Sequence, residues 1–208
     1  MIKRLVGFLM MVIGILSVTA GVGLGVYNLW DNDRAGIRAD IALNAIDQYR
    51  EKATAAPNES SEVLPDSAPD PSREMPVLEI DGKRYIGTVS IPAVAIELPV
   101  QEDWSLKLLS TSPCRYMGSV YEGNLIICGH DYATHFGRLG NLLPGDEVVF
   151  TDIEGTEFHY VVWEKLIIDG KAVEAMKSGD WDLTLFTCTL SGLTRTTIRC
   201  KLIENSEA

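Results

Sequence analysis

Positive charge is scarce in this sequence. Its 208 residues include 18 lysines and arginines against 29 aspartates and glutamates, which gives a formal net charge of −11. Such a balance repels a phosphate backbone and provides no broad basic surface. The composition therefore argues against a nucleic-acid partner, and the length leaves room for about one domain with accessory segments.

Cysteine and histidine are also rare, with four and three copies respectively. No two cysteines have the CxxC spacing of a zinc site, and the acidic residues do not follow the spacing of a calcium loop. We therefore expect no metal and no cofactor. An alternative interpretation treats all four cysteines as a structural disulfide or metal set. They are Cys114, Cys128, Cys188 and Cys200.

One long apolar run is present near the N-terminus. Residues 5–30 contain no charged side chain, and at ~1.5 Å rise per residue they are long enough to cross a ~30 Å hydrocarbon core. Lys3 and Arg4 precede the run while Asp31 and Asp33 follow it, so residues 1–4 are predicted to be cytoplasmic and the rest extracellular. We expect a single-pass protein of the cell membrane; the alternative is a cleaved signal peptide with its cleavage site near residues 18–20.

Two segments separate this predicted anchor from the rest of the chain. In residues 31–55, Ile37, Ile41 and Ala45 recur at four-residue steps among charged residues, which predicts a mostly solvated helical stalk. Residues 56–75 are rich in proline, serine and acidic residues, and are predicted to be a flexible linker. An arm of this composition that docks on the following domain is the alternative.

Residues 76–208 show the pattern of a β domain. Short runs rich in β-branched and aromatic residues alternate with turn signals such as Pro144-Gly145-Asp146. Two stretches between the runs, WSLKLLSTS and ATHFGRLGNL, are typical of short helices, and the second places Phe136 and Leu139 on one face. Many strands with few long helices predict a closed or nearly closed β-barrel.

The stretch DLTLFTCTLSGLTRTTIRC contains two predicted strands whose side chains can be sorted by alternation. Phe186 and Cys188 fall on one face of the first strand, opposite Leu185. In the second strand Cys200 lies on the apolar face and is predicted to be packing, whereas Arg195 lies on the polar face. If a loop joins the two strands as antiparallel neighbours, Cys188 and Arg195 lie side by side.

These motifs resemble those of the sortases, membrane-anchored cysteine transpeptidases of Gram-positive cell surfaces. TLFTC, residues 184–188, is similar to the TLxTC signature of that family, and Arg195 opens the next strand as the family requires. Gly129-His130 resembles the family's histidine motif, and IPAVAIELPV resembles the strand pair that opens its barrel. The resemblance covers about residues 77–204. It implies a mainly β fold, an eight-stranded sortase-type barrel with short helices.

The resemblance also implies a reaction and its residues. Cys188 would cleave an LPxTG-like sorting signal through a thioester, His130 would act as general acid and base, and Arg195 would stabilise the oxyanion. The partners would be surface proteins with a C-terminal sorting signal and a peptidoglycan precursor or other amine. Water would be a slower acceptor. Because Leu190 stands where many sortases have proline, a membrane-tethered barrel that binds peptides without chemistry is the alternative.

Other residues receive weaker assignments. Asp131 is a minor candidate for orienting His130, and the short segment between residues 168 and 182 has no room for the long inserted helix usual in class B sortases. The short interval between Cys188 and Arg195 and the absence of a hydrophobic helix near the C-terminus argue against the pilus-polymerising subclass. Three residues near Cys188 are predicted to touch substrate: Thr184, Thr187 and Ser191. Predicted to be structural or on the surface are Cys114, Cys128, His135, His159 and Arg199.

Overall fold

The computed structural model describes residues 2–55, 71–189 and 191–203. It comprises two compact units, Met1–Arg34 and Ala35–Ala208. In chain order the elements are α1 (Ile2–Ala55), β1 (Leu78–Ile80), β2 (Lys83–Ile91), η1 (Pro92–Val94), β3 (Ile96–Gln101), α2 (Leu106–Leu109), β4 (Cys114–Met117), β5 (Leu125–Gly129), η2 (Phe136–Asn141), β6 (Glu147–Asp152), β7 (Glu157–Asp169), α3 (Val173–Lys177), β8 (Leu183–Cys188) and β9 (Thr194–Leu202).

The first unit consists of the N-terminal part of α1. Within the described residues, this helix alone is long and apolar enough to cross a membrane, judged by length and composition. Its most apolar window has a mean hydropathy of 2.2, and none of that window is buried in protein. This helix could be the predicted membrane anchor, and a signal sequence has the same length and composition; the anchor and its orientation stay predictions.

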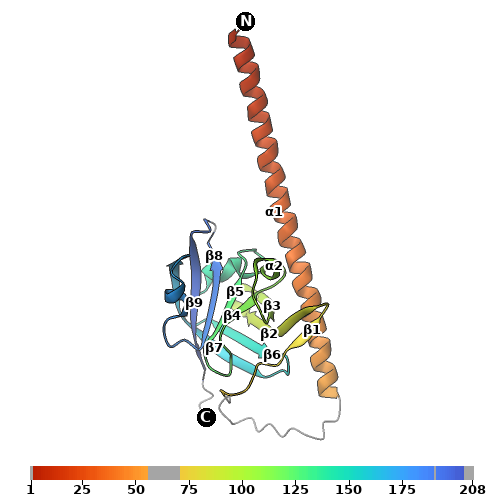
Figure 1. Cartoon of the computed structure of the whole chain (residues 1–208), viewed down its shortest axis with the longest axis vertical. Helices are drawn as coiled ribbons and strands as arrows, with labels where there is room; N and C mark the ends of the chain where they lie inside the picture. The colour runs from red at the N-terminus through yellow and green to blue at the C-terminus, as the bar shows by residue number, and fades with distance from the viewer. Residues whose placement is uncertain (1, 56–70, 190, 204–208) are drawn as a thin grey trace. The chain divides into compact units, whose positions relative to one another are not determined.

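The strands of the second unit form a closed barrel (Figure 1). The order β2-β3-β4-β5-β8-β9-β7-β6 contains eight strands, and pairing of β2 with β6 closes it, while β1 adds to the edge of β2. The pairs β3–β4 and β5–β8 are parallel and the other pairs are antiparallel. This architecture confirms the predicted eight-stranded barrel, and α2 and η2 lie in the two stretches predicted to form short helices.

Local sequence explains several details of the barrel. Pro92 begins the one-turn helix η1, where its fixed φ angle suits the first helical position. Gly87 pairs with Asp152 where β2 and β6 close the barrel, and a Cβ at residue 87 would lie 2.2 Å from the carbonyl oxygen of Thr151. Only glycine permits this approach. The β2–β6 ladder that closes the barrel therefore runs without a register shift, whereas the β2–β3 ladder shifts register between Tyr85 and Gly87.

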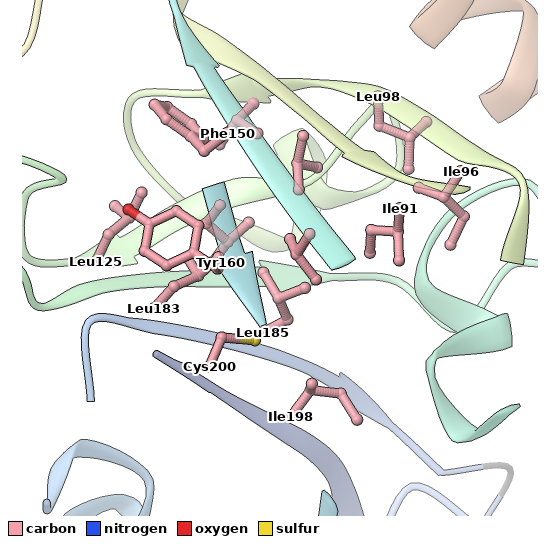
Figure 2. Close-up of a cluster of buried hydrophobic side chains, with 14 of the residues drawn as sticks. Ile91, Ile96, Leu98, Leu125, Phe150, Tyr160, Leu183, Leu185, Ile198 and Cys200 are labelled. Atoms are coloured by element: carbon pink, nitrogen blue, oxygen red, sulfur yellow. The ribbon is translucent and has the colours of Figure 1, made fainter. Parts of the chain in front are cut away.

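Inward-facing side chains fill the barrel (Figure 2). Leu183 and Leu185 of β8 point into this core, and Ile198 and Cys200 of the neighbouring β9 lie beside them. Tyr160 is the largest fully buried side chain. The alternation predicted for β8 and β9 is thus confirmed, including the role of Cys200 as packing. It leaves Phe186 and Cys188 on the opposite surface of β8.

From residue 35 onward, α1 packs against the barrel. The buried side chains are Ala35, Ala39, Ala42 and Ile46, a stripe with the period of an α-helix. Ala42 and Ile46 form a cluster with Tyr85 and Ile153 of the barrel. This differs from the expected solvated stalk, because the isoleucine face of the helix, Ile37 and Ile41, is the exposed one. The small alanine side chains let α1 lie close to the barrel, but alanine is too weakly hydrophobic for the sequence pattern to mark this face as buried.

A single arginine fixes the end of the docked helix. Arg50 donates hydrogen bonds to the backbone carbonyl oxygens of Thr151 and Asp152, at 2.9 and 2.6 Å, and its side chain is 18% exposed. These are the last residues of β6, next to the closure of the barrel. Residues 35–55 are therefore part of the same compact unit as the barrel. Most of the predicted linker, residues 56–70, lies outside the described residues.

Candidate active site

Cys188 and Arg195 face each other at the ends of β8 and β9. They are direct partners in the antiparallel ladder, and Arg195 Nη1 donates to Cys188 Sγ across 2.8 Å. Cys188 is half-buried, so its sulfur is held in place but remains accessible. The predicted proximity of these two residues is confirmed by the ladder. A permanent positive charge thus lies next to the only cysteine that is not buried.

His130 follows the last residue of β5, the strand on the other side of β8. The two strands are parallel, and Gly129 pairs with Thr187, so residue 130 follows beside residue 188. Neighbouring strands lie ~4.8 Å apart. The imidazole is 40% exposed. The fold therefore brings together, at one edge of the barrel, three residues that are far apart in the sequence. Their catalytic roles stay predictions.

Asp131 contacts the imidazole directly. His130 Nδ1 lies 2.9 Å from Asp131 Oδ1, and 3.1 Å from the backbone nitrogen of the same residue. The backbone N–H of Asp131 donates to Nδ1 in its neutral, unprotonated form, whereas the carboxylate of Asp131 accepts from Nδ1 when Nδ1 carries a proton. Both contacts engage Nδ1, so Nε2 is the ring nitrogen that Asp131 does not contact. The sequence assigned this role to Asp131 only as a minor candidate, because adjacent side chains usually point apart.

A cavity of about 320 Å³ opens beside the thiol. Its walls include Phe186 and Cys188 of β8, Arg195 of β9, and Gly129 of β5. Most of the remaining lining residues are apolar or aromatic and come from α2, β4, α3 and the segments next to them, and Asp169 is the acidic one; among the apolar and aromatic ones are Trp104, Leu109, Tyr116, Val173 and Met176. Such a lining suits an extended peptide with an apolar side chain.

Most of these lining residues were not predicted from the sequence. Phe186 was placed on the face of Cys188 by strand alternation, and it is the exception. Trp104 lies in the connection between β3 and α2, and Val173 is the first residue of α3. No periodic pattern in the sequence relates either residue to β8. Their convergence depends on the order of the strands in the barrel.

The other three cysteines are buried free thiols. Cys128 lies in the cavity wall close to Cys188, but burial raises its pKa to about 12. Burial also raises the pKa of Cys200 to about 12 and that of Cys114 above the ordinary range. Because the thiolate is the reactive form, these three side chains are predicted to be unreactive in the folded protein.

We expect a thiol-selective alkylating reagent to modify one cysteine in the folded chain and four in denaturant. Cys188 is accessible, whereas burial protects the other thiols and keeps them protonated. Peptide mapping by mass spectrometry after a short exposure measures the sites. A second rapidly labelled cysteine, or fewer than four labelled cysteines after unfolding, would contradict this arrangement and favour a disulfide among them.

The three predicted substrate contacts have different surroundings. Thr184 is buried and accepts a hydrogen bond of 2.7 Å from Arg199 Nη1. Thr187 is buried too, and Ser191 is exposed in the loop after β8, where its hydroxyl lies 3.0 Å from that of Thr189. None of the three lines the cavity. Their contact with substrate stays a prediction, and nothing in the geometry favours it.

The remaining candidates have structural surroundings. Arg199 is buried and donates to the carbonyl oxygens of Ala175 and Met176, which holds α3 against the barrel. His159 is exposed between Glu147 and Glu157, whose hydrogen bonds raise its pKa. Within residues 2–55, 71–189 and 191–203, no group of three or more histidine, cysteine or acidic side chains is arranged to hold a metal ion.

His135 is the one fully buried histidine. Burial lowers its pKa to about 4, while the backbone of Ala35 in α1 offsets part of this effect. In the unfolded chain the same side chain titrates near 6.5. Between about pH 4 and pH 6.5, the unfolded state therefore binds more protons at His135 than the folded state does. The contribution of His135 to stability is complete above pH 6.5 and is lost as the pH falls towards 4.

Between pH 7 and pH 4, the free energy of unfolding of the unmodified chain should fall by about 3 kcal/mol more than that of His135→Leu, because leucine has no proton to bind. Urea unfolding of the full chain at the two pH values, followed by tryptophan fluorescence, measures this difference. His159→Gln is the matched control, since His159 is exposed. If His135→Leu and the unmodified chain lose equal stability, His135 is not buried in its neutral form.

Comparisons with known proteins agree with this geometry. The family model described as Sortase domain matches residues 89–203, more than half of the 208-residue chain. Sortase A of Bacillus anthracis is 28% identical over 182 residues, which cover 84% of this chain and 83% of the relative.

Among solved structures, sortase C1 of Streptococcus agalactiae in complex with MTSET has a TM-score of 0.51 at 21% identity, covering 83% of this chain and 92% of that one. Sortase C of Clostridium perfringens, solved with the C-terminal cell wall sorting motif, has a TM-score of 0.51 at 18% identity, covering 79% and 89%. At these identities the likeness shows a common fold.

Proposed function

The chain belongs to the sortase family of transpeptidases, and on this premise we propose that it cleaves an LPxTG-like sorting signal through a thioester on Cys188. The acyl group would then pass to an amine of the cell wall. The 2.8 Å contact between Arg195 Nη1 and Cys188 Sγ, at the mouth of an apolar cavity, is the observation that supports this reaction most. His130 at the end of the adjacent strand supplies the acid and base.

In the first half of the reaction, the thiolate of Cys188 attacks a peptide carbonyl of the sorting signal. A carbon–sulfur bond forms and the carbon–nitrogen bond breaks. The departing amine takes a proton from Nε2 of the protonated His130, the ring nitrogen that Asp131 does not contact, and the imidazole becomes neutral. The products of this half are a thioester on Cys188 and the released C-terminal fragment.

In the second half, an amine of the cell wall attacks the thioester. His130, now neutral, accepts the proton of the amine, a new carbon–nitrogen bond forms, and the sulfur leaves as a thiolate. Water reacts by the same route and gives hydrolysis. The proton taken from the amine replaces the one that His130 gave in the first half, and the sulfur of Cys188 is released for another attack.

Arg195 would stabilise negative charge in both halves. Its guanidinium is charged at all physiological pH values and lies beside the sulfur that carries the substrate. A carbonyl oxygen that becomes an oxyanion on the carbon bound to that sulfur would lie within reach of the same group. The guanidinium of Arg195 lies over the ring of Phe186, with Cζ 5.7 Å from the ring centroid, which helps to hold it in place.

We further propose that the enzyme is anchored in the cell membrane and faces the cell surface. The apolar part of α1 supports the anchor, and the charges at its ends support an extracellular catalytic unit. The proposed segments are a cytoplasmic end at residues 1–4, the anchor at residues 5–30, a helical segment to residue 55, a linker at residues 56–75 and the barrel from residue 76.

A ligation assay on the full chain in detergent tests the proposed reaction. The assay offers a library of LPxTG-like and divergent pentapeptides together with amine acceptors, and mass spectrometry separates ligated from hydrolysed product. We expect at least one peptide to be ligated faster than it is hydrolysed. Peptide binding with neither product would overturn the proposal and favour the non-catalytic peptide-binding barrel.

A further inference from the structure

The segment that follows His130 contains three rings in successive contact, of which the first two are stacked. The imidazole of His130 lies parallel to the ring of Tyr132, with centroids 4.0 Å apart and an angle of 4° between the planes. Tyr132 in turn contacts His135 at 5.5 Å and 56°. These three side chains connect the edge of the candidate active site with the interior of the protein.

The backbone of this segment is held in one tight conformation. The carbonyl oxygen of Tyr132 accepts hydrogen bonds from the backbone nitrogens of His135 and Gly137, at 2.9 and 3.0 Å. The backbone nitrogen of Phe136 donates to the carbonyl oxygen of His130 at 3.1 Å, and the Phe136 side chain is fully buried in the barrel core. Tyr132 therefore projects from a fixed turn and not from a loose loop.

The docked part of α1 supports the same turn from outside. His135 is fully buried and, within the described residues, neither of its ring nitrogens has a hydrogen-bond partner, so its imidazole is held by packing, including the ring of Tyr132. At position 36 of the helix there is no side chain, and a Cβ on Gly36 would lie 3.1 Å from Cγ2 of Thr134. The helix and the turn therefore approach each other closely through small groups, and a side chain on residue 36 would press on Thr134.

We propose that Tyr132 is a positioning residue that holds the His130 imidazole in its reactive orientation, and that α1 supports it through His135; this inference rests on the proposed function. A histidine ring has two free torsions. The contact of Nδ1 with Asp131 opposes a flip of the ring about the Cβ–Cγ bond, and the parallel face of Tyr132 opposes a tilt of the ring toward that side. Both restraints are needed because His130 is 40% exposed and lies just beyond the end of a strand.

A merely structural role for Tyr132 makes a different prediction. In that case its loss would reduce stability but not alter the orientation of His130 or the rate per folded molecule. A positioning role requires the ring and not the hydroxyl, so phenylalanine should replace tyrosine and leucine should not. The comparison of Tyr132→Phe with Tyr132→Leu therefore separates the two roles.

We expect Tyr132→Leu to lower kcat about 10- to 100-fold with little change in KM, because misplacing a catalytic group by about 1 Å costs up to about 100-fold. Tyr132→Phe should retain most of the activity. Both variants are compared as full chains in detergent, in the ligation assay, at equal folded fraction. Equal activity in the phenylalanine and leucine variants, whether high or low, would overturn the proposal.

Nuclear magnetic resonance reports the stacking independently of activity. The chain has three histidines, so selective ¹³C labelling of histidine gives three imidazole signals, which His135 and His159 variants assign. The His130 signal should be shifted by the ring current of Tyr132 in the unmodified chain and in Tyr132→Phe. It should return towards the position of a free histidine in Tyr132→Leu. An unchanged position in Tyr132→Leu would contradict the stack.

The support from α1 is tested with Gly36→Leu. Leucine favours a helix more than glycine does, so the helix itself is not weakened, but the added side chain must displace Thr134. We expect a reduced kcat and a shifted His130 signal. Asn44→Leu, on the exposed side of the same helix, is the control and should change neither. If Gly36→Leu behaves like Asn44→Leu, α1 does not support the turn.

The proposal and the function on which it rests fail in different ways. Retained ligation by Cys188→Ala would refute the proposed chemistry whatever Tyr132 does. Loss of ligation in Cys188→Ala together with full activity in Tyr132→Leu would leave the chemistry intact and refute only the positioning role.

Discussion

Replacement of Cys188 by alanine should abolish both cleavage and ligation of sorting-signal peptides. The variant has no group that can form a thioester, and the remaining residues provide only binding and electrostatic stabilisation. Removal of the nucleophile from other hydrolases of this kind costs about six orders of magnitude in kcat. In the ligation assay on the full chain, the product should therefore be indistinguishable from background.

Cys128→Ala is the matched control for this experiment. Cys128 lines the same cavity and loses the same sulfur atom on substitution, but burial raises its pKa to about 12. The variant should bind peptide and ligate it at a rate within a few-fold of the unmodified chain, with a small loss of stability from the cavity. If Cys128→Ala abolishes ligation and Cys188→Ala does not, Cys188 is not the nucleophile.

Replacement of Arg195 should give the second largest effect. Arg195→Met keeps the length of the side chain and its packing on Phe186, but removes the charge next to the sulfur. Loss of one oxyanion donor typically lowers kcat about 10²- to 10³-fold. We expect a loss of this size for Arg195→Met. Arg195→Lys keeps the charge without the planar fork and should lose less.

The kinetics distinguish a chemical role for Arg195 from a structural one. If the guanidinium stabilises the oxyanion, kcat and kcat/KM fall together, whereas loss of simple substrate binding raises KM at constant kcat. Thermal unfolding of each variant shows whether the fold is maintained. A variant Arg195→Met with normal kcat would exclude Arg195 as the oxyanion donor, even if its KM were higher.

The part of this site that could be predicted from the residues themselves is the pair Cys188 and Arg195, and it followed from strand alternation and the geometry of an antiparallel ladder. The period of two along residues 183–188 separated Leu185 from Cys188, and the short loop after Cys188 placed Arg195 beside it. The barrel itself followed from the number of strand-length runs and the scarcity of long helices. These are local properties, and a single sequence contains them.

Features that depend on contact between distant segments were not predicted. The buried face of α1 is formed by Ala35, Ala39, Ala42 and Ile46, and alanine has too little hydrophobicity to mark a core face when isoleucines lie on the opposite side. Tyr132 gave no signal either, because an aromatic residue in a turn has no periodic partner. That His130 belongs with Cys188 was expected from the resemblance to sortases alone, and the pairing of β5 with β8, which brings residue 130 beside residue 188, is known from the strand order.

The central claim is that catalysis passes through an acyl group on the sulfur of residue 188. The most direct test is to mix the full chain with a reactive sorting-signal peptide without amine acceptor, quench with acid, and map the adduct by mass spectrometry. The account predicts one acyl adduct, located on the peptide that contains Cys188 and removed by hydroxylamine. Ligated product formed without any adduct, or an adduct on Cys128, would contradict it.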